Sequence, residues 1–346
     1  MAGIADDQPL REGVVIQTDE FVDDELVEPE RMEFGSAANI TRTEAREALL
    51  NYVAQYCCFG KGAAKELMML KVVPSNAMHY TLETFCEGRY TTYDDKPYQG
   101  GAVDGSHNGS APDPWTLRAN PSQMFQDERQ YLRIPHTSEV RVCSTCQGSR
   151  KVTCGFCRGS GFNKCNSCSG RGEKDDRDKD GNHITKRCTS CNGRGETRCS
   201  SCNGSGQQQC YHCNGYGKVE VFRKLNIVYK NHVADYVLEG ANLPSILVRR
   251  VQGVEIFSQT DRKVWPITKF PVHEINQHSV DLVNLARKGH PKERQLQQRQ
   301  TLTAVPVTRI DYAFKKFKSS FWVYGLQREV YAPDYPQQKC CGCSIL

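Results

Sequence analysis

Six Cys-x-x-Cys pairs between Cys143 and Cys213 are the residues of this chain whose types and spacing point most directly to chemistry. A Cys-x-x-Cys turn presents two thiolates on one side of a tight knuckle, and two knuckles supply the four sulfurs of a tetrahedral zinc site. Each repeat is too short to bury an apolar core, so the metal has to supply folding energy. The predicted ligands are Cys143, Cys146, Cys154, Cys157, Cys165, Cys168, Cys188, Cys191, Cys199, Cys202, Cys210 and Cys213.

The spacing of the six pairs is symmetric about the centre of the segment. The pairs that begin at 143, 154 and 165 are eleven residues apart, as are those that begin at 188, 199 and 210, whereas the central step is twenty-three residues. This palindrome favours a segment folded back on itself, in which the first pair meets the sixth, the second the fifth and the third the fourth. Three zinc ions would then be bound. Pairing of sequence neighbours is the alternative, and it explains the symmetry less well.

Closed sites of four cysteines leave no open coordination position, so catalytic zinc is not expected. An iron–sulfur site and thiol redox chemistry are the rival interpretations of the pairs. Six nearly identical pairs argue against a single redox dithiol. Glycine after each knuckle permits positive φ and lets backbone amides approach the sulfurs.

The charge pattern bears on the partner. The net charge of +5 combines −9 over residues 1–34 with +14 over the remainder. From Cys143 to Cys213 there are twelve Lys/Arg and six Asp/Glu. Twelve thiolates and three Zn²⁺ would bring this formal +6 close to zero. The basic residues therefore fit local compensation for zinc–thiolate clusters better than a phosphate-binding surface, which does not favour nucleic acid as the partner.

The Cys-x-x-Cys-x-Gly-x-Gly repeats, folded back with a long central step, resemble the cysteine-rich zinc domain of DnaJ-type co-chaperones. In that family four repeats pair first with fourth and second with third to hold two zinc ions. The family's zinc domain emerges from a β-rich substrate-binding domain and helps to hold unfolded clients. The resemblance thus implies protein clients or a chaperone partner. Six repeats make the third zinc an extrapolation, and Arg150 replaces the last glycine of the first repeat.

Outside this segment the chain departs from DnaJ-type proteins. A His-Pro-Asp tripeptide is absent and His290-Pro291-Lys292 lacks the required context, so no J domain is visible and stimulation of a heat-shock ATPase is not implied. The whole layout resembles the animal ssu-two homologue family, which carries such a zinc domain without a J domain.

The elements that must carry the cysteine-rich segment are predicted on both sides of it. Thr41 to Glu44 fits a capping box, followed by a helix with Ala45, Leu49, Tyr52, Val53 and Tyr56 on one face that ends at Gly60 and Gly62. A short helix over 63–70 precedes Pro74, followed by a strand over 78–93, a loop over 94–122 and an extended segment over 130–142.

Strand patterning resumes after the last knuckle. Strands are predicted over 218–238 and 246–257, a helix over 274–288 with Gly289 as its stop, and a hairpin of 302–314 and 321–330 around a basic tip, 315–318. The expected fold is α+β: a β-rich domain with a few helices, an inserted cysteine-rich zinc-binding hairpin arm and a disordered acidic N-terminus. The expected segments are the tail 1–40, the first part of the α+β domain 41–142, the zinc domain 143–217, the second part 218–335 and a cysteine-rich tail 336–346.

Other residues with potential chemistry carry weaker signals. Asp176-x-Asp178-x-Asp180-Gly181 resembles the start of an EF-hand loop, but Arg187 occupies the position of the last ligand, so a solvated hairpin tip is the better interpretation. His79, His232, His273 and His278 are isolated in the sequence and are not expected to be ligands or bases. Cys57, Cys58 and Cys86 are expected to be ordinary buried thiols.

The last four residues, Cys343-Ser-Ile-Leu346, fit a prenylation box, and the terminal leucine indicates a geranylgeranyl group. Cys340 and Cys341 are candidates for palmitate, since one lipid alone holds a protein only reversibly. An accidental or metal-binding tail is the alternative.

The mean hydropathy of −0.61 and the absence of a long apolar run predict a soluble protein of 346 residues. No secretory signal is visible, so a cytoplasmic location is expected, with a membrane surface reached through the lipid and the nucleus left open. The predicted function is a non-enzymatic zinc protein with chaperone-like binding of unfolded protein. The alternatives are a nucleic-acid-binding zinc module and a thiol–disulfide oxidoreductase that uses Cys-x-x-Cys pairs.

Overall fold

The chain has a β-rich fold with few helices, as the sequence predicts. The structure is a computed structural model that describes residues 40–177, 179 and 183–338. Nearly all of the acidic tail and the three candidate lipidation cysteines lie outside the described residues. The described chain divides into two compact units, one made of Arg89–Ala119 and Gln130–Asn226, the other of residues 40–88, 120–129 and 227–338.

Within the described residues, the largest sheet contains eight strands. Its order is β14–β13–β12–β1–β10–β2, with β11 paired to β12 and β3 paired to β10. The strands are β1 (Met68–Pro97), β2 (Glu128–Arg133), β3 (Glu139–Val142), β10 (Lys218–Leu238), β11 (Val254–Asp261), β12 (Arg294–Phe314), β13 (Phe317–Tyr324) and β14 (Glu329–Tyr331). β1 and β10 each contribute residues to both units.

β1 is thirty residues long, so the expected breaks at Pro74 and at residue 94 are wrong. Pro74 lies opposite Thr308 of β12, and Pro306 of β12 lies opposite Asn76 of β1. Hydrogen-bonded and non-hydrogen-bonded pairs alternate along an antiparallel ladder, and these two pairs are two residues apart, so both belong to the same kind. Proline has no N–H to donate and therefore fits non-hydrogen-bonded pairs. Asp94 continues the strand, and its carboxylate accepts a hydrogen bond from Lys224 Nζ of β10 at 2.6 Å.

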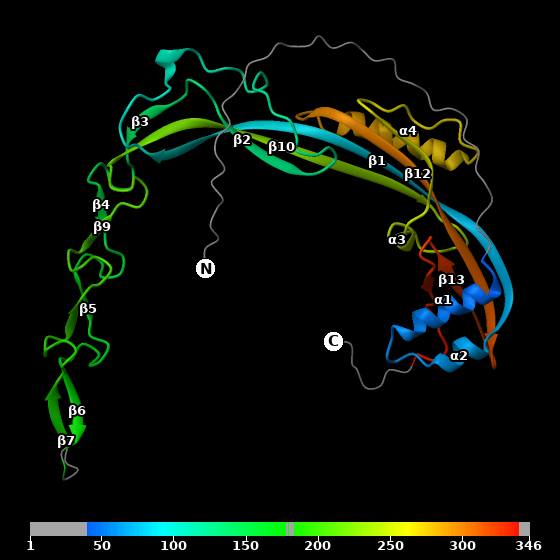
Figure 1. The fold of residues 1–346 in the computed structure, drawn as a ribbon, viewed down its shortest axis with the longest axis horizontal. Coiled ribbons are helices and arrows are strands. Elements are labelled where there is room, and N and C mark those ends of the chain that lie inside the picture. Colours follow the sequence, from blue (N-terminus) through cyan, green and yellow to red (C-terminus); the bar gives the residue numbers. More distant parts are fainter. Residues whose placement is uncertain (1–39, 178, 180–182, 339–346) are drawn as a thin grey trace. The chain divides into compact units, whose positions relative to one another are not determined.

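The helices of the second unit pack on the sheet through alternate residues of its strands. Leu302 and Ala304 of β12 lie in the same core cluster as Ile275 and Val283 of α4 (His273–Gly289). Val305 and Val307 point to the other face, where they pack with Val248 of α3 (Ser245–Val248). Figure 1 shows α4 beside β12. The predicted helix over 274–288 is confirmed.

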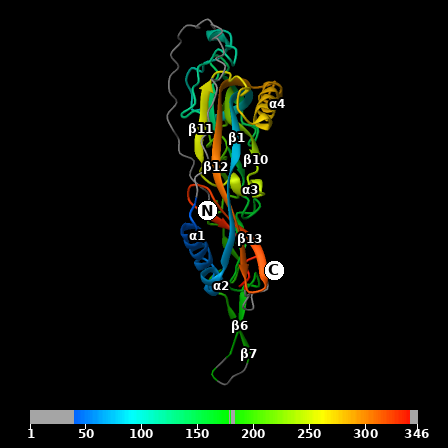
Figure 2. The ribbon, with the colours of Figure 1, turned by 90° about the vertical axis from the view of Figure 1, so that its right-hand side faces the viewer.

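A third cluster joins α1 (Arg42–Ala54) and α2 (Lys61–Glu66) to β12, β13 and β14, and Figure 2 shows both helices beside β13. The predicted capping box is confirmed: the Glu44 amide donates to Thr41 Oγ1 at 3.2 Å, and the Thr41 amide donates to Glu44 Oε2 at 2.8 Å. The first helix is shorter than predicted, because α1 ends at Ala54, and Tyr56, expected on its apolar face, lies beyond it and is exposed. The predicted helix over 63–70 is wrong in its last residues, because α2 ends at Glu66 and β1 begins at Met68.

The predicted strand over 246–257 is wrong in its first half. Pro244 precedes a single helical turn, α3, and β11 begins only after Gly253. A Cβ on Gly253 would lie 2.5 Å from the carbonyl oxygen of Ala304, so glycine is needed where the chain joins β12. A hairpin is confirmed here, formed by β12 and β13 with Phe314 opposite Phe317 across a two-residue turn. The predicted bounds of its second strand, 321–330, are wrong, because β13 already begins at Phe317 and a turn at Gly325 separates it from β14.

The cysteine-rich segment, residues 143–217, consists of three short two-stranded ladders, which follow one another along the segment in Figure 1. They are β4 (Lys151–Thr153) with β9 (Gln207–Gln209), β5 (Phe162–Lys164) with β8 (Glu196–Arg198), and β6 (Glu173–Arg177) with β7 (His183–Arg187). A short 3-10 helix, η1 (Ser106–Asn108), lies earlier in the same unit.

Candidate metal centres

The backbone of every knuckle follows one pattern. In all six repeats the residue after the second cysteine and the glycine that follows it have φ between +46° and +89°. Glycine adopts this region without strain, and asparagine tolerates it better than most residues, which accounts for Asn192, Asn203 and Asn214 in the last three repeats. Two successive left-handed residues turn the chain back beneath the sulfurs.

Backbone amides point at the sulfur atoms of the second cysteines. In five repeats the last glycine donates its amide to this sulfur at 3.2–3.3 Å. In the first repeat Arg150 occupies this position with φ +68°, and its amide donates to Cys146 in the same way. The arginine therefore preserves the hydrogen bond at the cost of an unfavourable backbone conformation.

The knuckles pair through their backbones as well as through their sulfurs. The amide of Cys154 donates to the carbonyl of Gly206 at 2.9 Å, and the amide of Cys199 donates to the carbonyl of Gly161 at 2.8 Å. Equivalent reciprocal bonds join the other two pairs of knuckles. β4–β9 and β5–β8 continue the pairing between successive knuckles. The backbone hydrogen bonds therefore follow the same nested pairing as the sulfurs.

The twelve cysteines form three groups of four, grouped as the nested pairing predicts. The groups are Cys143, Cys146, Cys210 and Cys213; Cys154, Cys157, Cys199 and Cys202; and Cys165, Cys168, Cys188 and Cys191. The sulfur–sulfur distances across each pair of knuckles are 3.6–3.9 Å. Four sulfurs bound tetrahedrally to zinc at about 2.3 Å would be about 3.8 Å apart. The groups therefore fit a zinc ion each.

No buried apolar side chain of the described residues joins the second and third groups of cysteines, whereas Val219 packs against the first group. All twelve cysteines are buried, with exposed fractions of at most 8%. Apolar side chains therefore contribute little to holding these knuckles together. This is the situation in which metal–sulfur bonds supply the folding free energy.

Desolvation and hydrogen bonds shift the pKa values of the thiols in opposite directions. Desolvation raises the pKa of Cys157, but the amide of Gly161 and the neighbouring thiols outweigh it and lower this pKa to about 6. Desolvation raises the pKa of Cys165 to about 11, whereas hydrogen bonds from Cys191 outweigh desolvation at Cys188 and lower its pKa to about 6. Without a metal, each of these groups would therefore mix thiolate and thiol near neutral pH, and a metal would displace the remaining protons.

The hairpin tip holds only part of the EF-hand-like pattern within the described residues. Asp176 lies in β6 and pairs with Lys186 of β7 at 2.7 Å, which lowers the pKa of the carboxyl. Asp178, Asp180 and Gly181 lie outside the described residues. The described part of the pattern is thus a cross-strand ion pair.

A fourth group joins residues that are isolated in the sequence. Cys86 Sγ, a ring nitrogen of His232 and a carboxylate oxygen of Glu293 all lie within 4.8 Å of one another. His232, isolated in the sequence, therefore has two potential ligand residues beside it, because β1, β10 and the turn before β12 meet although their residues are far apart in the chain. Cys86 is buried as expected, and burial raises the pKa of its thiol to about 11.

The other singled-out residues belong to none of these groups. Among the described residues, His79, His273 and His278 join no metal-binding group. Cys57 is exposed and Cys58 is half-buried, because both follow the end of α1, so their expected burial is wrong.

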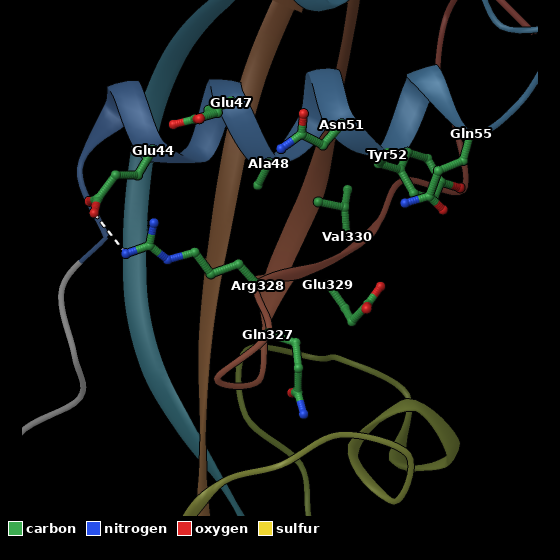
Figure 3. A pocket seen from close by; sticks show the side chains of 10 residues that line it. All are labelled: Glu44, Glu47, Ala48, Asn51, Tyr52, Gln55, Gln327, Arg328, Glu329 and Val330. Carbon is green, nitrogen blue, oxygen red and sulfur yellow. Dashed lines mark hydrogen bonds and ion pairs between the residues drawn. The ribbon is translucent and has the colours of Figure 1, made fainter.

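A pocket of about 240 Å³ lies between α1 and the loop that leads into β14 (Figure 3). Glu44, Glu47 and Glu329 line it together with Arg328, and Glu44 pairs with Arg328 at 2.8 Å. The described residues that line this pocket form no metal-binding group.

Known proteins are similar in sequence to this chain over most of its length. Protein SSUH2 homolog from Homo sapiens is 38% identical over 316 residues, which cover 89% of this chain and 80% of that protein. The protein of the same name from Danio rerio is 38% identical over 88% of this chain and 82% of its own length. That from Mus musculus is 40% identical over 72% of this chain and 74% of its own length. No family model matches the chain. None of the described helices is long and apolar enough to cross a membrane.

Proposed function

The chain belongs to the family of the SSUH2 homologs, and we propose that it is a non-enzymatic zinc protein that binds protein clients in a chaperone-like manner. The observation that carries the proposal is the set of three buried four-cysteine groups. A closed site of four cysteines has no free coordination position, so its zinc serves to fold the segment and not to activate a substrate. The twelve cysteines of the three groups are the proposed ligands, one zinc ion for each group.

Exposed aromatic side chains on the cysteine-rich segment support protein as the partner. Phe156 and Tyr211 lie in the middle of their knuckles with 74% and 76% of their surface exposed, and Phe162 and Tyr216 are exposed nearby. Large aromatic residues are the side chains that contribute most to protein–protein contacts. The similarity of the repeats to the zinc domain of DnaJ-type co-chaperones favours unfolded clients among these partners.

Client binding is tested with the zinc-loaded full chain. We expect it to slow the aggregation of a thermally unfolding model protein, measured by light scattering. The double variant Phe156→Ser/Tyr211→Ser should lose at least half of this effect and keep its zinc content, because neither side chain is a proposed ligand.

Leu285→Ser is the matched control, because Leu285 is 63% exposed but lies on α4 in the other unit. This variant should keep the full effect. Aggregation that proceeds unchanged in the presence of the wild-type chain would contradict the proposal. An equal loss in the control would also count against it, because the contact would then not belong to the cysteine-rich segment.

A further inference from the structure

We propose that Cys86, His232 and Glu293 form a fourth zinc site, with sulfur, nitrogen and oxygen ligands and an open coordination position. All three residues lie in the unit that does not contain the cysteine-rich segment. The site is therefore independent of the three four-cysteine groups and of the function proposed for them. Three protein ligands with one free position are the pattern of zinc sites that bind a water molecule or a small ligand.

The distances fit a single ion. The three ligand atoms lie within 4.8 Å of one another, and His232 Nε2 is 2.7 Å from Glu293 Oε2. Zinc bonds of about 2.0–2.3 Å in tetrahedral geometry would place ligand atoms about 3.3–3.8 Å apart. The hydrogen bond between His232 and Glu293 would open by only about half an ångström to admit the ion.

The charges and the ligand types also select zinc. A thiolate from Cys86 and the carboxylate of Glu293 together balance the two positive charges of the ion. Sulfur and imidazole ligands suit zinc and do not suit magnesium or calcium, which take oxygen ligands. One pair of neighbouring charges is already matched, since Arg294 forms an ion pair with Glu87.

A β-bulge lies beside this point. The register between β1 and β12 shifts between Phe85 and Cys86, so that Phe85 faces Gln297 whereas Cys86 faces Gln295, and the extra residue, Leu296, lies in β12. The bulge therefore bends β12 near its start, close to Glu293, and bulges occur next to functional sites more often than elsewhere.

The neighbouring residues hold the imidazole and leave a way in. His290 stacks on the His232 ring with centroids 3.5 Å apart, which makes it a positioning residue. The Cys86 side chain is buried, while the side chains of His232 and Glu293 keep 20% and 28% of their surface exposed. Solvent therefore reaches one side of the site, as an open coordination position requires.

Nucleophilic catalysis by Cys86 is the other use that such residues have. It requires a base that accepts the thiol proton, and His232 would have to be that base. The Cys86 thiol instead hydrogen-bonds the Glu293 carboxylate. Cys86 and His232 thus both hydrogen-bond Glu293, so the imidazole is not the partner of the thiol proton.

The proposal is tested by counting zinc ions on the full chain by native mass spectrometry with metal analysis. The variant His232→Ala should bind one zinc ion fewer than the wild type, and Glu293→Gln should do the same while preserving the shape of the side chain. The control is His278→Ala, because His278 also stacks on an aromatic ring, that of Tyr236 at 3.5 Å, but belongs to no metal-binding group among the described residues. It should bind as many ions as the wild type.

The test rests on the difference in zinc count between the wild type and each variant, because this difference does not depend on how many of the four-cysteine groups hold zinc. An unchanged count in both His232→Ala and Glu293→Gln overturns the fourth site. If His232→Ala does not fold, Glu293→Gln alone decides. Loading the wild type and Glu293→Gln with Co²⁺ gives a second readout, in which one mixed-ligand cobalt spectrum should disappear and the spectrum of cobalt bound to four thiolates should remain.

Discussion

In five of the six repeats the last glycine sets how closely the two halves of the cysteine-rich segment approach each other. A Cβ on Gly206 would lie 2.3 Å from the carbonyl oxygen of Gly159, and the corresponding distance for Gly161 is 2.4 Å. At the first pair of knuckles the chains are more open, because a Cβ on Gly217 would lie 2.9 Å from the carbonyl oxygen of Gly148. This pair is also the one that contains Arg150, so the side chain occurs where the backbone leaves most room.

Gly206→Ala should destabilise the segment by about 2–4 kcal/mol, since a left-handed conformation and an overpacked contact both add cost. The measurement is the free energy of unfolding of the cysteine-rich segment, obtained by denaturant titration of the zinc-loaded chain. Gly155→Ala is the matched control, because Gly155 follows Cys154 of the same four-cysteine group but a Cβ there would meet no atom within 4 Å. Its effect should stay below about 0.5 kcal/mol. Equal effects of the two substitutions would show that close backbone approach does not limit the fold.

Among the elements, α1 depends on Glu44 at both its start and its tertiary contact. Glu44 closes the capping box with Thr41 and also pairs with Arg328 before β14 (Figure 3). Hydrogen bonds from the Thr41 amide and hydroxyl, followed by the charge of Arg328, lower the pKa of this carboxyl below 4.5. The same side chain therefore joins the helix end to the strand loop.

Thr41→Ala should lower the free energy of unfolding by about 1 kcal/mol, because the first turn loses its cap, whereas Thr41→Ser should be nearly neutral.

A carboxyl whose folded pKa is depressed stabilises the protein above its unfolded pKa and loses that contribution as pH falls through the folded pKa. The wild type should therefore lose more stability than Glu44→Gln as the pH is lowered from neutrality to below 4.5. Parallel unfolding curves for the two proteins at all pH values would rule out this role of Glu44.

The local elements with strong periodicity could be predicted from sequence, and those fixed by strand pairing could not. α4 and β10 are predictable nearly to their ends, because apolar residues recur at helical or alternating spacing throughout them. β1 extends past Pro74 and into the polar stretch at Asp94 because neighbouring strands continue beside it. Such pairing is a property of the sheet and leaves no signal in the strand's own residues.

At the scale of the whole molecule, the same contrast separates the two kinds of candidate site. The four-cysteine groups are predictable because their ligands repeat within one segment at spacings that only a folded-back chain explains. The group of Cys86, His232 and Glu293 is not, because its residues come from three parts of the chain and each alone has an ordinary structural role. The pairing of β1 with β10 on one side and with β12 on the other brings them together.

The two units also differ in what stabilises them. The unit that carries α1, α2 and α4 has large apolar clusters, whereas the second and third groups of the cysteine-rich segment consist of cysteines alone. Chelation of zinc should therefore unfold the cysteine-rich segment and leave the helix-bearing unit folded. Hydrogen exchange followed by mass spectrometry should show amides of 154–202 losing protection by at least about tenfold after chelation, while those of α4 and β12 keep theirs.

Re-addition of zinc should restore the protection, which separates metal loss from irreversible damage. The variant Cys199→Ser/Cys202→Ser is the internal comparison, because it removes half of the second group and should expose that region without any chelator. Protection of 154–202 that survives complete metal removal would mean that backbone pairing alone holds the knuckles, and zinc would then be an accessory to the fold. Simultaneous loss of protection in α4 would mean instead that the two units unfold together.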